Sequence, residues 1–305
     1  MKKIEAYCFA DDRADFWDNF QKREETDFVG IYDSSNTCIL PDMDACNYTL
    51  YRYHQFLWNK QCMVFKNSNK LKINFVHLHE NGLGLTIDKK NINLGSDSFI
   101  SICWHYSDMQ NILENVKEKK QHQKYIEEVN EIDEKVKERR KYKENWSDWK
   151  KFIWLYLQKS NTIGGFIVFP RSPASINGER GLNAKIRDRF DLTLECIKRY
   201  YINQNEAGNP LLDVLKKDHE FFEIFGSGLE GFKNYIDFFI LNSWIEEDKE
   251  HHYHVKSLLH DNETLDKWDF NTEKPLPKDS DEWWIFYKNI MDRLKERNNL
   301  IKMSI

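Results

Sequence analysis

The stretch IGGFIVFPRSPASINGERGLNAKIRDRFD, residues 163–191, decides how the sequence is interpreted. It opens with two glycines and a short apolar run that ends at Pro170, which is the pattern of a buried β-strand. A loop rich in glycine, proline and serine follows over residues 172–181. Asn183 is then a suitable N-cap, because its side chain can accept a hydrogen bond from the first N–H groups of a helix. The segment therefore predicts a strand, a loop and a helix in direct succession.

This segment is also a candidate anion site. A strand–loop–helix arrangement gathers backbone N–H groups and the positive end of a helix dipole, which suits a phosphate or a carboxylate. Arginines add planar, bidentate donors. The chain has no GxxxxGK[ST] loop, and no GxGxxG pattern follows this strand, so the site would not be of a known nucleotide-loop type. The candidate ligand-binding residues are Arg171, Asn177, Arg180 and Arg189.

The same charges have a purely structural interpretation. Arg187 and Asp191 are spaced four residues apart, and such pairs stabilise the surfaces of ordinary helices. Asp188 and Arg189 could instead pin the loop as buried ion pairs. The residue types alone leave the ligand site and the structural lock both open.

Two residues are candidate proton-transfer groups, and thus candidate catalytic residues. His54 lies in a predicted helix over residues 49–60, and histidine is the side chain that titrates near neutral pH without perturbation. Asp188 is the second. If the protein is an enzyme, metal-independent acid–base chemistry on a phosphate or glycosyl bond fits these groups best. His77 and His79 share a face of a predicted strand but would need a third ligand to hold zinc, so no metal and no cofactor are expected.

The first hundred residues predict an α+β unit with a small antiparallel sheet. Residues 70–79 alternate in polarity, and Asn81-Gly82 is a strong hairpin signal before a returning strand over residues 83–88. Residues 98–104 form the third predicted strand.

A charged stretch without helix breakers separates this unit from the segment quoted first. No Gly or Pro occurs from His105 to Ile163, and apolar residues recur with the four-and-three spacing of a coiled-coil seam. We predict a long charged helical arm over residues 106–160. It is either a solvated spacer or an arm that binds a partner, for example as a homodimer.

The remaining residues predict a mainly helical C-terminal half. Apolar periodicity indicates helices over residues 186–201, 211–225, 232–245 and 282–301, with a polar loop over residues 246–280. The predicted fold class is therefore α+β, mainly helical, with a small antiparallel sheet and a charged arm. The predicted parts are an N-terminal lobe over residues 1–105, the arm over 106–160 and a C-terminal lobe over 161–305.

Composition excludes several classes of protein. Among 305 residues only 12 are Gly and 6 are Pro, which excludes collagen-like and low-complexity chains. The 40% hydrophobic content and the net charge of −5 indicate a folded protein and disfavour a general nucleic-acid coat, although a local basic patch is allowed. Six scattered cysteines without a CxxC pair, and no signal peptide or membrane span, predict a reduced, cytoplasmic protein.

Two parts of the chain together resemble a widespread family of uncharacterised bacterial proteins. They are the YHxxLW pattern at residues 53–58 and the series GGFIVFP, SINGERG and DRFDLTLECIKRYY within residues 164–201. The resemblance covers most of residues 47–104 and 160–245, and the charged arm departs from it. It implies no activity, but it marks the matching residues for testing: Tyr53, His54, Trp58, Lys60, Arg171, Asn177, Arg180, Asp188, Arg189 and Asp191.

Two hypotheses of different kinds follow. In the first, the protein binds, and acts on if it is an enzyme, a phosphate-bearing ligand such as a nucleotide or a nucleic acid. In the second, it is a non-enzymatic interaction module that uses the helical arm, and the arginine and aspartate residues form a structural lock.

Overall fold

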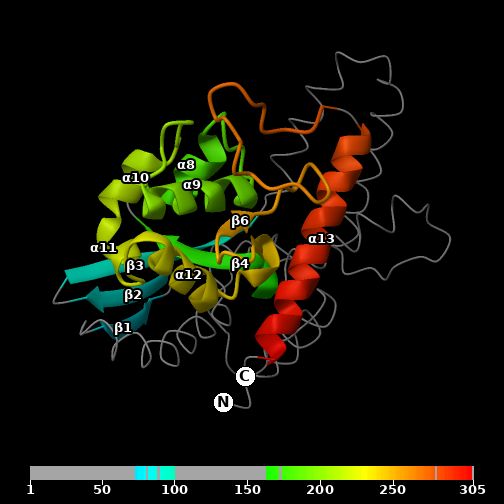
Figure 1. Cartoon of the computed structure of the whole chain (residues 1–305). Coiled ribbons are helices and arrows are strands. Elements are labelled where there is room, and N and C mark those ends of the chain that lie inside the picture. The colour runs from blue at the N-terminus through cyan, green and yellow to red at the C-terminus, as the bar shows by residue number, and fades with distance from the viewer. Residues whose placement is uncertain are drawn as a thin grey trace, which may run out of the picture.

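The computed structural model describes only part of the chain, namely residues 73–79, 82–87, 90–99, 163–171, 174–278 and 280–303. The predicted helix over residues 49–60 with His54, and the arm over 106–160, lie outside the described residues. Within them the fold is α+β and mainly helical, as the sequence predicts (Figure 1). No helix in this part of the chain is long and apolar enough to cross a bilayer.

A four-stranded antiparallel sheet joins the two halves of the sequence. Its order is β1 (Ile73–His79), β2 (Gly82–Ile87), β3 (Lys90–Ser98) and β4 (Phe166–Pro170). The predicted hairpin is confirmed. The next strand in the described residues, β3, lies over residues 90–98, and most of the predicted strand over 98–104 lies outside the described residues. Polar residues dominate β3, so apolar alternation does not reveal it; its pairing with β2 and β4 satisfies the backbone instead.

Strand β4 is the buried strand that the apolar run predicts. All five of its residues are buried, and it pairs with β3 from Leu94↔Pro170 to Ser98↔Phe166. The short 3-10 helix η1 (Ile163–Gly165) leads into it. The first half of the chain therefore supplies β3, the strand with which β4 pairs at one edge of the described sheet.

Helices and a small second sheet cover this framework. In chain order they are α8 (Ile176–Leu182), α9 (Phe190–Ile202), α10 (Leu212–Lys217), α11 (His219–Glu223), α12 (Gly228–Phe239), the 3-10 helix η2 (Asn242–Trp244), β5 (Ile245–Glu247), β6 (Tyr253–Val255) and α13 (Ser280–Met303). Helix α9 packs against α12, and α13 packs against η1 and η2. Figure 1 shows α13 running along one side of the other described elements.

The region after β4 differs from its predicted course. Residues 176–182 form helix α8 where a loop is predicted, because Ser175 accepts a hydrogen bond from the Gly178 N–H and caps the helix. Asn183 is the C-cap of α8 and not an N-cap. Helix α9 begins only at Phe190, after two residues with left-handed backbone angles that interrupt the helical path.

Two further predictions are corrected. The predicted helix over residues 211–225 is broken at Asp218, which ends α10 and precedes α11. The predicted polar loop over residues 246–280 contains strands β5 and β6, which pair as a two-stranded antiparallel sheet. Helix α13 confirms the C-terminal amphipathic helix.

An aromatic cluster joins the sheet to the helices. The ring centroid of Phe99, just after β3, lies 4.0 Å from that of Phe190 at the start of α9. Trp244 of η2 packs edge-on against both, at 5.2 and 5.0 Å. All three side chains are buried, so this cluster fixes where the loop between α8 and α9 runs.

Candidate functional site

Arg180 on α8 is the most heavily bonded of the predicted site residues, and it is fully buried. Its Nη1 donates to Asp97 Oδ2 at 2.6 Å and lies 3.0 Å from Asp188 Oδ1. Its Nη2 donates to the Phe99 carbonyl at 2.6 Å and to the Asp188 carbonyl at 3.2 Å, and Nε donates to Thr193 Oγ1 at 3.2 Å. Every guanidinium nitrogen therefore has a protein acceptor.

Arg189, the N-cap residue of α9, is also fully buried but faces different partners. Its Nε and Nη2 form a bidentate pair with Asp191, and Nη1 donates to the Pro275 carbonyl at 2.6 Å. The Trp268 ring lies 5.2 Å from the guanidinium carbon. Asp191 also accepts the Leu258 N–H at 2.9 Å, so this pair fastens two C-terminal loops to α9.

The other predicted residues lie apart from these two. Arg171 is exposed at the end of β4, where its backbone N–H donates to the Asn93 carbonyl at 2.6 Å. Asn177 is half-buried on α8. The structure thus brings Arg180 and Asp188 together, directs Arg189 to another set of acceptors and leaves Arg171 at the surface. Ligand binding by these residues stays a prediction.

Two arginines outside the predicted site follow the same pattern. Arg199 of α9 donates to the Trp268 carbonyl at 2.6 Å, and Arg297 of α13 donates to the Gly164 and Phe239 carbonyls at 2.8 Å. Both are buried. A signal for Arg297 exists in the sequence, because it continues an apolar stripe of α13 at helical spacing, where a charged residue must find partners.

Buried guanidinium groups of this kind work as cross-links. Each ties several backbone segments together, and removing a buried charged partner costs about 3–5 kcal/mol because the other groups lose their hydrogen bonds. The contacts of Arg180 and Arg189 therefore have the form expected of a structural lock.

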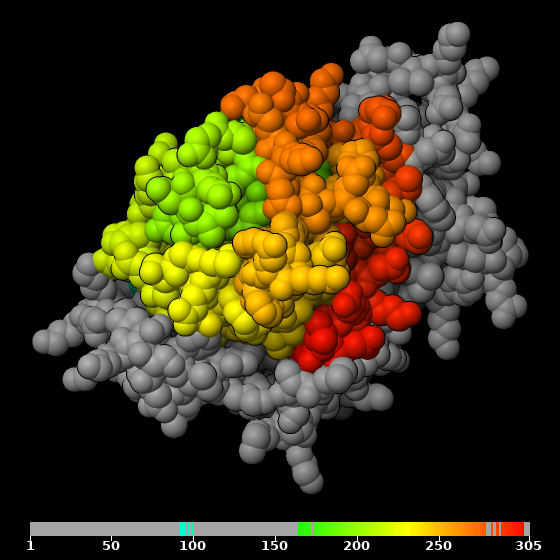
Figure 2. All heavy atoms as spheres, in the orientation of Figure 1, coloured from blue at the N-terminus to red at the C-terminus, as the bar shows by residue number. Residues whose placement is uncertain are grey.

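A different part of the surface is hollowed. A cavity of about 250 Å³ lies between α13, the β5–β6 sheet and the turn at residues 261–263. Figure 2 shows the orange segment that contains this turn lying against the red helix α13. Five carboxylates, two cationic side chains and two asparagines line the cavity, which we call the acidic cavity: Glu246, Lys256, Asp261, Asn262, Glu263, Asn289, Asp292, Arg293 and Glu296.

One of the two cations in the acidic cavity is held by the protein itself. Arg293 donates from Nη1 to the Ser243 carbonyl at 3.1 Å and from Nη2 to the Ser257 carbonyl at 2.9 Å. Its guanidinium carbon lies 5.7 Å from the Trp244 ring centroid. Burial lowers the pKa of Arg293. Nearby carboxylates, including that of Asp191, shift this pKa in the opposite direction by a smaller amount. The Arg293 charge is thus directed into the wall, and the carboxylates dominate the space. No sequence motif marks this cavity, because its residues come from three separate segments.

The described residues show no group of three or more His, Cys, Asp or Glu side chains placed to hold a metal ion.

The fold and its buried arginines define an α+β protein cross-linked by guanidinium groups. Residues 24–136 and 128–301 match the model of a family of unknown function (DUF6994), and the chain belongs to this family. The prediction of an uncharacterised family is confirmed at that level, while the quoted motifs stay a prediction. Comparison with curated proteins and with solved structures finds no match.

Proposed function

We propose that this protein is a binding module that recognises a positively charged side chain of a partner protein in the acidic cavity. The observation that carries the proposal is the lining of that cavity, in which five carboxylates surround a space whose one arginine is bonded into the wall. This develops the interaction-module hypothesis, with the acidic cavity in place of the arm as the binding surface. Neighbouring charges of one sign focus a field that attracts a ligand of the opposite sign.

The size of the cavity supports a small cationic group. Pockets for drug-sized ligands have volumes of roughly 300–1,000 Å³, whereas this one has about 250 Å³. One ammonium or guanidinium group with part of its aliphatic stem suits that space better than a whole nucleotide. Asp261, Glu263, Asp292 and Glu296 are exposed and can therefore meet an arriving partner.

The phosphate hypothesis has less support. A phosphate entering the acidic cavity would be repelled by its carboxylates, and the donors of Arg180 and Arg189 are directed at protein acceptors. Exposed Arg171 is the remaining arginine of the predicted phosphate site. Anionic probes therefore belong in the same experiment.

Calorimetric titration of the full chain tests the proposal. The probes are a short peptide with two arginines, the same peptide with citrulline in place of arginine, free spermidine and ATP. We expect the arginine peptide to bind, more weakly as salt concentration rises, and the uncharged citrulline peptide not to bind. Binding of spermidine or ATP without binding of the arginine peptide would overturn the proposal.

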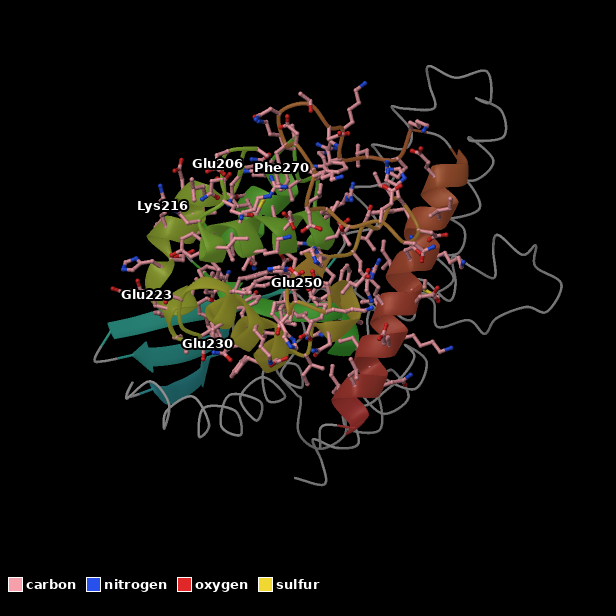
Figure 3. All side chains as sticks on the ribbon, viewed as in Figure 1. Glu206, Lys216, Glu223, Glu230, Glu250 and Phe270 are labelled. Atoms are coloured by element: carbon pink, nitrogen blue, oxygen red, sulfur yellow. The ribbon has the colours of Figure 1, made fainter. Side chains whose placement is uncertain are left out.

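A matched pair of double variants locates the binding. Glu263→Gln with Glu296→Gln removes two carboxylates of the acidic cavity, and we expect peptide affinity to fall about tenfold, since exposed ion pairs contribute up to about 1 kcal/mol each. Glu206→Gln with Glu230→Gln makes the same change on exposed residues that lie away from α13 (Figure 3). This control should bind as the unaltered protein does, and an equal loss in both variants would show that only overall charge matters.

A further inference from the structure

Two carboxylates bracket the imidazole ring of His254 in β6. Nδ1 lies 2.8 Å from Asp266 Oδ2, and Nε2 lies 3.2 Å from Asp248 Oδ2. An ionised carboxylate only accepts hydrogen bonds, so both ring nitrogens must donate, and only the doubly protonated imidazolium does so. A neutral ring would point one lone pair at a carboxylate.

Both carboxylates are held in the ionised form. The backbone N–H of His252 is the main cause that lowers the pKa of Asp248. Burial raises the pKa of Asp266, but hydrogen bonds from Lys198, Thr264 and His254 offset it and hold this pKa at about 2. Near neutral pH, His254 therefore faces two anions.

Asp266 connects this ring to helix α9. Lys198 of α9 donates from Nζ to Asp266 Oδ1 at 2.6 Å, and the same Nζ lies 2.8 Å from Oε2 of buried Glu195. The contacts form a continuous chain from the loop after β5, through His254 and Asp266, to α9. His254 lies in strand β6, within the segment over residues 246–280 for which the sequence predicts a polar loop.

We propose that His254 is a protonation-controlled clamp, whose imidazolium fastens the β5–β6 hairpin to Asp266 and α9 and whose deprotonation releases one of the two carboxylates. The hairpin also carries Glu246 and Lys256, which line the acidic cavity. Opening of the clamp therefore affects two residues that line the cavity. The clamp itself does not depend on which ligand the cavity binds.

The charged groups around His254 favour its protonated form. Besides the two aspartates, Glu246 is its cross-strand partner in β5, and the ring of His252 lies 6.4 Å away. Lys198 on α9 is the opposing cation. Desolvation, the largest single contribution, lowers the pKa of His254, but the hydrogen bonds to Asp248 and Asp266 and the charge of Asp266 together raise it above its usual value.

The sign of the pH effect follows from that direction. A group whose pKa is higher in the folded state stabilises the fold fully below its unfolded pKa, which for histidine is about 6.5. The contribution is lost as pH rises through the higher folded pKa. The clamp should therefore be closed at pH 6 and open progressively above neutral pH.

Two measurements on the full chain test the clamp. A nitrogen-detected NMR titration of the histidine rings, assigned with His254→Gln, should give His254 an apparent pKa above about 6.5 with both nitrogens protonated at pH 6. Hydrogen exchange of the β5–β6 amides, corrected for intrinsic rates, should show protection falling between pH 6 and pH 9. The protection factor should fall about tenfold for each unit by which folding raises the pKa of His254, because one pKa unit corresponds to a tenfold change in the equilibrium between closed and open clamp.

Matched variants distinguish the clamp from a general pH effect. His254→Gln should abolish the pH dependence of protection in the hairpin, and His260→Gln, the same change at an exposed histidine, should preserve it. Asp248→Asn removes one anion and should lower the His254 pKa without removing the ring. A His254 that titrates at or below about 6.5, or an unchanged pH dependence in His254→Gln, would overturn the proposal.

Discussion

The buried arginines and the surface around His254 use charge in opposite ways. Arg297 is fully buried, and its donors meet backbone carbonyls of η1, β4 and the end of α12. His254 keeps 28% of its side chain exposed and meets two carboxylates whose charges are also solvated. A guanidinium stays protonated at every accessible pH, whereas an imidazolium gains and loses its proton. Charge in the first region therefore fixes architecture, and charge in the second can respond to conditions.

The largest expected effect comes from breaking the buried region at Arg180. Arg180→Ala removes the partner of Asp97 and Asp188 together with the donors to the Phe99 carbonyl. We expect the free energy of unfolding to fall by about 3–5 kcal/mol, since Asp188 and the Phe99 carbonyl stay buried but lose the Arg180 donors. Urea denaturation monitored by circular dichroism measures the loss.

The matched control for this variant is Arg171→Ala, which removes an exposed arginine of the same predicted site. Its unfolding free energy should change by less than about 0.5 kcal/mol, as is usual at the surface. If Arg180→Ala is too unstable to purify, Arg180→Lys keeps the charge but loses the forked donor and should give a smaller loss. An Arg180→Ala protein as stable as the unaltered chain would favour the ligand-site interpretation.

A second prediction concerns the backbone packing in the buried region. A Cβ added at Gly231 on α12 would lie 2.6 Å from the Gly226 carbonyl carbon and 2.7 Å from its oxygen. Because backbone atoms cannot move aside cheaply, Gly231→Ala should cost about 1–3 kcal/mol. At Gly181 in α8 nothing lies within 4 Å of the added atom, so Gly181→Ala should be neutral or stabilising by up to about 1 kcal/mol. Thermal unfolding of the two variants compares them, and equal melting temperatures would contradict this account.

Local sequence patterns predict those elements whose formation depends on residues close together in the sequence. The apolar run of β4, the hairpin of β1 and β2 and the stripe of α13 each carry their own signal within a short window. Helix α8 was missed because its sequence contains two glycines and polar residues, and its start depends on one side-chain cap from Ser175. Strand β3 was missed because its pairing partners, and not its own apolar pattern, make it a strand.

The candidate site was less predictable, for a reason that is also physical. The sequence allows a buried ion pair between Asp188 and Arg189, but Asp188 pairs with Arg180, and Arg189 pairs with Asp191. Two further acceptors of Arg180, on Asp97 and Phe99, lie more than 80 residues away in the sequence. Whether an arginine faces a ligand or a carbonyl depends on such distant partners. The same holds for His254, whose protonation depends on Asp248 and Asp266 on either side of it.

The smallest expected effect comes from an ion pair that has the same chemistry as the buried ones but lies at the surface. Lys233 and Asp237 pair along α12 at i,i+4 spacing, with side chains 46% and 42% exposed. Water and salt screen such a pair, so Lys233→Ala should lower the free energy of unfolding by at most about 0.5 kcal/mol. A double-mutant cycle with Asp237→Ala measures the coupling. A coupling as large as the loss in Arg180→Ala would mean that burial does not account for the strength of the Arg180 contacts, because an exposed ion pair would then stabilise the fold as much as a buried one.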